Sequence, residues 1–174
     1  MHHAHGFTAI ELAATLLIAA IIMASALPGF ALLLEQQRVG TAGRDFLRSA
    51  TFARLRACHL GSRVALTYKN GDWNQGWIVY RDDNRNGRRD PNEKILYEHG
   101  PLNARIRVVV GSTVKDYLGY GGDGFSVHAN NAFFADTITF CPTHPAASGY
   151  RLTIARGGRI RVDAVAAKTK PCVK

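Results

Sequence analysis

The chain begins with an apolar stretch that covers positions 7–34 and contains one ionisable side chain, Glu11. A helix needs about 20 apolar residues to cross a bilayer, and a helix over 7–34 extends roughly 42 Å. The pattern therefore predicts a transmembrane helix over 7–34, preceded by a short leader over 1–6.

A second pattern, over positions 35–60, repeats apolar residues at steps of three and four, which is typical of one face of a helix. Gly61 follows this stripe and is the expected helix stop. The sequence therefore predicts one long helix that begins in the membrane, continues as an amphipathic segment over 35–60 and ends under a second domain. The stripe consists of Val39, Ala42, Phe46, Ala50, Ala53 and Ala57.

Beyond position 61 the pattern changes to short apolar runs separated by turns, which is typical of strands. No helical pattern alternates with these runs, so a parallel sheet is not expected. The predicted fold class is α+β, with the long N-terminal helix packed on an all-β, antiparallel, sandwich-like domain over 61–174. Strands are expected at 63–68, 76–80, 94–98, 105–110, 137–140, 150–155 and 159–165, a turn at 70–71 and a glycine-rich loop at 119–124.

Charge is unevenly distributed along the chain, whose formal net charge is +9. All 22 Lys and Arg residues lie beyond position 34, together with every acidic residue except Glu11. A domain this basic favours an anionic partner such as nucleic acid or a membrane surface. A solvated basic surface without a partner is the alternative.

Glu11 is the unusual residue of the apolar stretch, because a carboxylate there costs about 2.5–3.5 kcal/mol on insertion scales. No Lys or Arg lies near it in the sequence. Cleavage between Gly6 and Phe7 would create an α-amino group one helical turn before Glu11. That amine, or the amine of a neighbouring copy, is the expected partner of the carboxylate.

The segment 6–12, with the sequence GFTAIEL, resembles the prepilin peptidase site of type IV pilins and type II secretion pseudopilins. The resemblance implies cleavage after Gly6, N-methylation of Phe7, and pairing of Glu11 with the N-terminal amine of an adjacent subunit. Pro28 matches the helix-bending proline of these families. The implied partners are the peptidase, other pilin subunits and the bacterial inner membrane. The implied location is a single-pass inner-membrane protein that moves into a periplasmic and cell-surface filament.

The β domain carries a second set of landmarks, which resembles the GspH/FimT group of minor pilins and pseudopilins. They are WNQGWIVYRDDNRNG over 73–87, Glu93, and GRIR over 158–161. This resemblance implies a FimT-like minor type IV pilin that binds DNA for uptake in natural transformation, a competence function. The alternative is a structural subunit, either the H-type minor pseudopilin of type II secretion or a pilus-priming minor pilin without DNA binding.

Arg159 and Arg161 alternate with Ile160 and Val162 after an expected turn at 157–158. In a strand, this alternation places both arginines on the open face and both apolar residues on the core face. Residues two apart lie about 6.6–6.8 Å from each other, close to twice the ~3.4 Å charge spacing of one DNA strand. The element also resembles the one through which FimT-type pilins bind DNA, and an exposed polar strand face is the alternative. The expected DNA-binding residues are Arg156, Gly158, Arg159, Arg161, Lys168 and Lys170.

Residues 82–93 fit the EF-hand calcium-loop pattern of alternating oxygen ligands, a glycine and a final Glu. The candidate ligands are Asp82, Asn84, Asn86 and Glu93. The flanks resemble strands, and three arginines within the loop oppose cation binding. We therefore expect a structural hairpin loop, with a calcium site as the alternative.

The three cysteines, Cys58, Cys141 and Cys172, match no zinc-ligand spacing. Outside the cytoplasm a disulfide is expected, and three pairings are possible. We expect Cys141–Cys172, which would pin the C-terminal tail to the β domain, and a buried free thiol at Cys58.

Motifs of catalysis are missing from the sequence, which contains no GxSxG, Walker or dinucleotide-binding pattern. The sequence therefore predicts a protein that is not an enzyme, with no cofactor and no small-molecule substrate.

Overall fold

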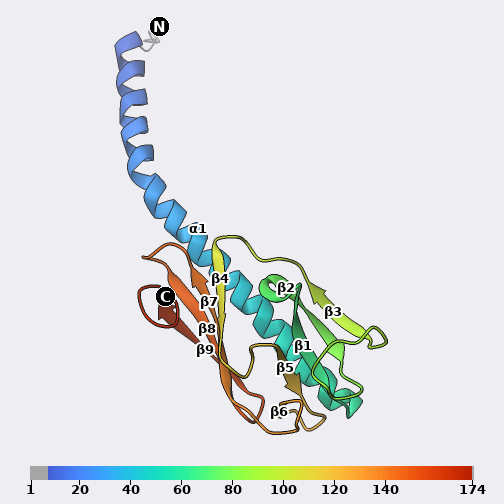
Figure 1. Ribbon diagram of the computed structural model, residues 1–174. Helices are drawn as coiled ribbons and strands as arrows, with labels where there is room; N and C mark the ends of the chain where they lie inside the picture. The colour runs from blue at the N-terminus through green and yellow to red at the C-terminus, as the bar shows by residue number, and fades with distance from the viewer. Residues whose placement is uncertain (1–7, 174) are drawn as a thin grey trace.

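A computed structural model describes residues 8–173 and shows one long helix whose C-terminal half packs on a β domain (Figure 1). Helix α1 spans Ala9–Leu60. Its N-terminal part is long and apolar enough to cross a membrane, and none of that part is buried against the rest of the protein. Gly6 and Phe7 lie outside the described residues.

Both ends of α1 are capped by local hydrogen bonds. At the start, the Thr8 hydroxyl accepts a hydrogen bond from the Glu11 N–H, and the Glu11 carboxylate accepts one from the Thr8 N–H, which is a capping box. At the end, Gly61 adopts a left-handed conformation and donates its N–H to the Ala57 carbonyl. The expected helix stop at Gly61 is therefore present.

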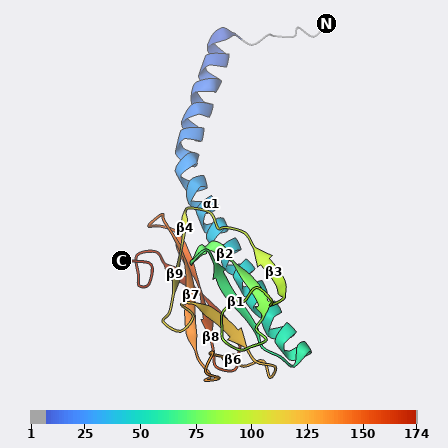
Figure 2. The same ribbon diagram turned by 45° about the vertical axis from the view of Figure 1, so that its right-hand side comes forward.

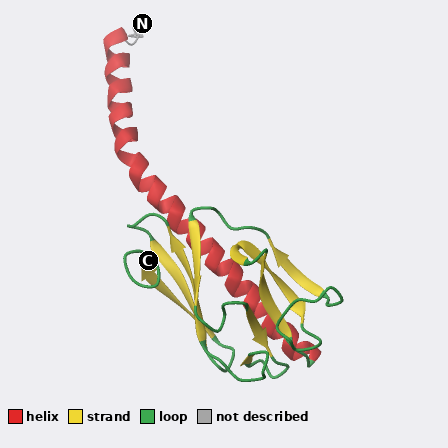
Figure 3. Cartoon of the chain, viewed as in Figure 1, coloured by secondary structure: helices red, strands yellow, loops and turns green. Residues whose placement is uncertain are grey.

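Within residues 8–173, nine antiparallel strands form two sheets, which Figures 2 and 3 show on the C-terminal half of the helix. One sheet has the strand order β3-β2-β1-β5-β6, and the other has the order β4-β7-β8-β9. The strands are β1 Val64–Lys69, β2 Asp72–Arg81, β3 Ile95–His99, β4 Ile106–Val110, β5 Tyr117–Tyr120, β6 Ser126–Val127, β7 Asp136–Pro142, β8 Ser148–Ile154 and β9 Ile160–Ala166. The predicted fold class is confirmed.

The core lies where the apolar stripe of α1 meets both sheets. All six residues of the stripe are buried. Phe46 is fully buried, and its ring lies 5.2 Å from Trp77 of β2 and 5.8 Å from Phe140 of β7. The indole N–H of Trp77 donates to the Ser49 hydroxyl at 2.9 Å. The helix therefore holds the two sheets together through a common core.

One expected loop is partly a strand. Gly119 and Tyr120 belong to β5, where they pair with Ala65 and Val64 of β1. The prediction of a loop over the whole of 119–124 was wrong, because a four-residue strand interrupted by a glycine has a weak sequence pattern. Pairing with the buried strand β1, a non-local contact, is what makes this segment a strand.

Candidate nucleic-acid interface

The turn between β8 and β9 is fixed by Gly158, which is buried and has a positive φ of 73°. Its N–H donates to the Ala155 carbonyl at 2.8 Å, and the Ala155 N–H donates to the Arg159 carbonyl at 2.9 Å. A Cβ atom on Gly158 would lie 2.0 Å from the Gly124 carbonyl oxygen. The glycine is therefore required by backbone conformation and by close approach, and it positions the residues that follow it.

Arg54 of α1 joins this turn to the 121–125 loop. Its Nε donates to the Gly124 carbonyl at 2.8 Å, and its Nη2 donates to the Gly157 carbonyl at 3.0 Å. Sequence reasoning missed this role, because Arg54 is one of several arginines on the polar side of the helix and its partners lie 70 and 103 residues away. The turn is thus held on the last two turns of α1.

Three arginines around the turn, Arg156, Arg159 and Arg161, have exposed side chains, and we call them the hairpin arginines. Arg161 lies opposite Thr153 of β8. Arg159 lies at the end of the turn, one residue before β9 begins. The structure therefore brings these three predicted residues together at one end of the β8–β9 hairpin.

The prediction that Val162 faces the core is wrong, because the residue is 39% exposed. Its partner across the ladder, Leu152, is fully buried. The difference arises because β9 is an edge strand, whereas the helix packs against its neighbour β8. Ile160, by contrast, packs against the core as expected.

Lys168 and Lys170 lie beyond the far end of β9, which extends about 20 Å over its seven residues. They belong to the C-terminal tail, where Arg151 donates to the Lys170 carbonyl at 3.1 Å and Arg107 donates to the Cys172 carbonyl. Apart from the buried Gly158, the predicted DNA-binding residues therefore divide into the hairpin arginines and a separate pair of tail lysines, and both groups are exposed.

Cys141 and Cys172 form a disulfide with a Cα–Cα distance of 5.5 Å, as the sequence led us to expect. The bond attaches the tail to β7. Cys58 is a free thiol, but its predicted burial is wrong because the residue is exposed. It follows the buried Ala57 and is rotated about 100° from the apolar stripe of the helix.

The 82–93 loop uses its candidate ligand oxygens to bind its own backbone. The Asp82 carboxylate accepts the N–H groups of Asn86 at 3.1 Å and Gly87 at 3.2 Å. The Glu93 carboxylate accepts the N–H groups of Asp83 and Asp90, both at 2.9 Å. These bonds hold the loop closed between β2 and β3.

The two asparagines of the loop are also engaged, since the side-chain amides of Asn84 and Asn86 both donate to one oxygen of Asp90. Burial raises the pKa of Asp82, although Arg63, 3.9 Å away, opposes this effect. Within residues 8–173 no group of three His, Cys, Asp or Glu side chains is arranged to hold a metal ion. The flanking elements are strands, as expected for a structural hairpin loop.

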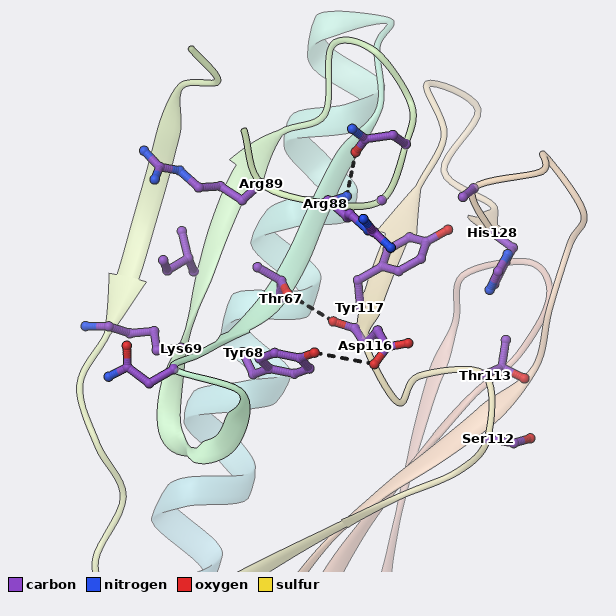
Figure 4. A pocket seen from close by; sticks show the side chains of 15 residues that line it. Thr67, Tyr68, Lys69, Arg88, Arg89, Ser112, Thr113, Asp116, Tyr117 and His128 are labelled. Carbon is purple, nitrogen blue, oxygen red and sulfur yellow. Dashed lines mark hydrogen bonds between the residues drawn. The ribbon is translucent and has the colours of Figure 1, made fainter. Parts of the chain in front are cut away.

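A cleft of about 750 Å³ lies beside this loop on the five-stranded sheet (Figure 4). Its cations are Lys69, Arg88 and Arg89, and Asp116 supplies a carboxylate. The Thr67 hydroxyl donates to the Asp116 carbonyl at 2.9 Å, which ties β1 to the wall of the cleft. This second basic region lies on a different sheet from the hairpin arginines.

One long N-terminal helix packed on antiparallel sheets is the architecture shared by type IV pilins and pseudopilins. Residues 42–158 match the family model described as Type II transport protein GspH, and the chain therefore belongs to this family of minor pilins and pseudopilins. Its members are structural subunits and not enzymes. A search of curated proteins finds no match.

Two solved structures are similar to this fold. The type IV minor pilin FimU of Pseudomonas aeruginosa has a TM-score of 0.61 and 18% identity, and the match covers 81% of this chain and 99% of FimU. The minor pseudopilin EpsH from the type 2 secretion system of Vibrio cholerae has a TM-score of 0.52 and 11% identity, with coverage of 73% and 97%. At these identities the similarity shows the fold alone.

Proposed function

We propose that this protein is a FimT-like minor type IV pilin, assembled into a pilus, that binds DNA for uptake in natural transformation. The observation that carries the proposal is the exposure of the hairpin arginines at the end of the domain remote from the membrane-spanning part of α1. The helix has 52 residues and extends roughly 78 Å. Arg54 holds the β8–β9 turn near the C-terminal end of α1, so the hairpin arginines lie far from the bilayer.

The proposal includes processing and assembly at the N-terminus. The prepilin peptidase cuts after Gly6, Phe7 is N-methylated, and Glu11 pairs with the N-terminal amine of an adjacent subunit as the inner-membrane protein enters the filament. One oxygen of Glu11 accepts hydrogen bonds at 2.9 Å from both the N–H and the hydroxyl of Thr8. These bonds support the proposal, because they hold the carboxylate at the start of the helix, where a neighbouring amine would approach it.

Duplex DNA binding by the full-length protein in a nonionic detergent tests the proposal. We expect Arg159→Ala with Arg161→Ala to weaken binding to all sequences alike. The slope of log affinity against log salt should become shallower by about 2, since each phosphate contact contributes about one unit. The matched control is Arg88→Ala with Arg89→Ala, which removes the same charge from the loop beside the five-stranded sheet.

Wild-type affinity in the Arg159/Arg161 double variant would overturn the assignment of the patch. An equal loss in the control variant would mean that net charge alone attracts DNA. Lys168→Ala with Lys170→Ala tests the tail lysines as a second, weaker phosphate contact, for which we expect a smaller loss than for the arginine pair.

A second candidate function is that of a structural subunit, either an H-type minor pseudopilin of type II secretion or a pilus-priming minor pilin. It is favoured by the GspH family match and by the similarity of the fold to EpsH. In this case the hairpin arginines contact neighbouring subunits. DNA binding would then depend no more on the hairpin arginines than on the control pair Arg88 and Arg89, and the Arg159/Arg161 variant would fail to associate with its filament partners.

A further inference from the structure

Two phenylalanines of the β domain are exposed and in contact with each other. Phe125 is 42% exposed and Phe133 is 53% exposed. Their ring centroids lie 5.2 Å apart with an interplanar angle of 49°. Single exposed apolar residues are ordinary, but contiguous apolar surface is more often a site of interaction. Neither ring belongs to the buried core, so packing inside the domain does not explain why the two rings are there.

The aromatic pair reaches the hairpin arginines through the chain that carries Phe125, which runs beside Arg156. Phe125 is flanked by Gly124, whose carbonyl accepts from Arg54, and by Ser126, whose N–H donates to the Arg156 carbonyl at 3.1 Å. The Ser126 side chain is completely buried. Since neighbouring residues in extended chain point to opposite sides, the Phe125 ring points outward, one residue from the backbone bond to Arg156.

Phe133 also lines a cleft of about 610 Å³, together with Arg85, Asp123 and three glycines. The glycines, at positions 61, 121 and 122, leave part of the wall as bare backbone. Arg63 is buried and joins two segments that line the cleft. It donates hydrogen bonds to the Arg85 carbonyl at 3.0 Å and to the Asn131 side chain at 2.6 Å. The cleft therefore offers a flat aromatic face, an exposed arginine and room for a planar group.

We propose that Phe125, Phe133 and this cleft bind the unpaired bases of single-stranded DNA, while Arg85 and the hairpin arginines bind the flanking phosphates. The inference rests on the proposed function and adds single strands and frayed ends to its duplex ligand. Aromatic side chains within a basic surface form the usual platform for single strands, because every base has a π-face. The surrounding arginines favour a polyanion over an apolar protein segment as the occupant.

Fluorescence anisotropy with the full-length protein in nonionic detergent tests this proposal with three probes. They are an oligothymidylate, an abasic oligonucleotide of the same length, and a duplex. The abasic strand keeps the phosphates and lacks the bases. We expect wild-type protein to bind oligothymidylate at least about tenfold more tightly than the abasic strand, the scale of one stacked base.

Phe125→Ala with Phe133→Ala should reduce oligothymidylate affinity to the abasic level and leave duplex affinity unchanged. Phe125→Tyr with Phe133→Tyr should keep wild-type affinity, since the ring is retained. The matched control is Tyr97→Ala, which removes an aromatic side chain that is also 42% exposed, but on β3. Thermal unfolding of each variant verifies that the fold is intact.

Equal affinity of the wild-type protein for abasic and thymidylate strands would overturn the inference, and so would an alanine pair that binds thymidylate normally. If duplex binding still depends on the hairpin arginines, the proposed function stands while this inference fails. If the wild-type protein binds no DNA, both fail. If the alanine pair loses association with pilin subunits but keeps thymidylate affinity, the surface is a protein contact and the inference is wrong.

Discussion

Replacing Gly158 with alanine tests the structural role of this glycine, because the substitution leaves the arginines that follow it in place. The residue has a φ of 73°, and an added Cβ would meet the Gly124 carbonyl oxygen at 2.0 Å and Arg54 Nε at 2.8 Å. Neither the backbone conformation nor the space fits an alanine. The β8–β9 turn would have to move away from the 121–125 loop and from Arg54.

The magnitude follows from two effects. A left-handed conformation costs a non-glycine residue about 1–2 kcal/mol, and forcing a methyl group into a filled site costs about 1–3 kcal/mol. We therefore expect Gly158→Ala to lower the free energy of unfolding by about 2–5 kcal/mol. For a domain of this size, such a loss corresponds to a decrease in Tm of roughly 10 °C.

Gly157 provides the matched control, since a Cβ there meets no atom within 4 Å. Gly157→Ala should change the free energy of unfolding by less than about 0.5 kcal/mol. Tryptophan fluorescence during urea unfolding is a suitable assay, because both tryptophans, Trp73 and Trp77, are buried in the β domain. Wild-type stability of Gly158→Ala, or equal destabilisation by both variants, would refute the reasoning.

Three further predictions concern the helix contact, the helix–loop junction and the 82–93 loop. Gly43→Ala should lower the free energy of unfolding by about 1–3 kcal/mol, because its Cβ would lie 2.1 Å from the Tyr150 ring. The Cβ of Gly40→Ala meets only the flexible end of Arg44, so this variant should raise the free energy of unfolding by up to about 1 kcal/mol. Urea unfolding measures both changes. Burial would raise the pKa of Glu35, but hydrogen bonds from His144 and Thr143 outweigh it and lower the pKa. The stabilisation from Glu35 is therefore present above the unfolded-state pKa and is lost as pH falls through the folded-state pKa. On acidification, the urea midpoint of Glu35→Gln should consequently fall less than the midpoint of the wild-type protein. Calcium should leave the Tm unchanged in thermal unfolding, since the loop oxygens already accept N–H groups, and a calcium-dependent rise would contradict this.

The long helix was predictable because its two patterns are local. An apolar stretch, a stripe from Val39 to Ala57 and a stop at Gly61 are all visible in the sequence, and the helix runs to Leu60. Most strands were predictable from short apolar runs for the same reason. The strand β5 was not, because pairing with β1 rather than its own pattern makes it a strand.

The site was predictable only in part, because its arrangement depends on tertiary contacts. The alternation of Arg159 and Arg161 with apolar residues was visible, but the exposure of Val162 follows from the edge position of β9. Phe125 and Phe133 resemble core residues in the sequence, and only the fold places them outside. Similarly, the contacts of Arg54 with two distant glycines have no local pattern.

Photo-crosslinking tests the central claim, that DNA binds at the end of the domain that carries the hairpin arginines. Full-length protein in nonionic detergent would be irradiated with DNA containing bromodeoxyuridine, and the crosslinked peptides identified by mass spectrometry. The account predicts crosslinks within residues 125–133 and 156–161. Crosslinks confined to the cleft that Lys69, Arg88 and Arg89 line, or none at low salt, would contradict it.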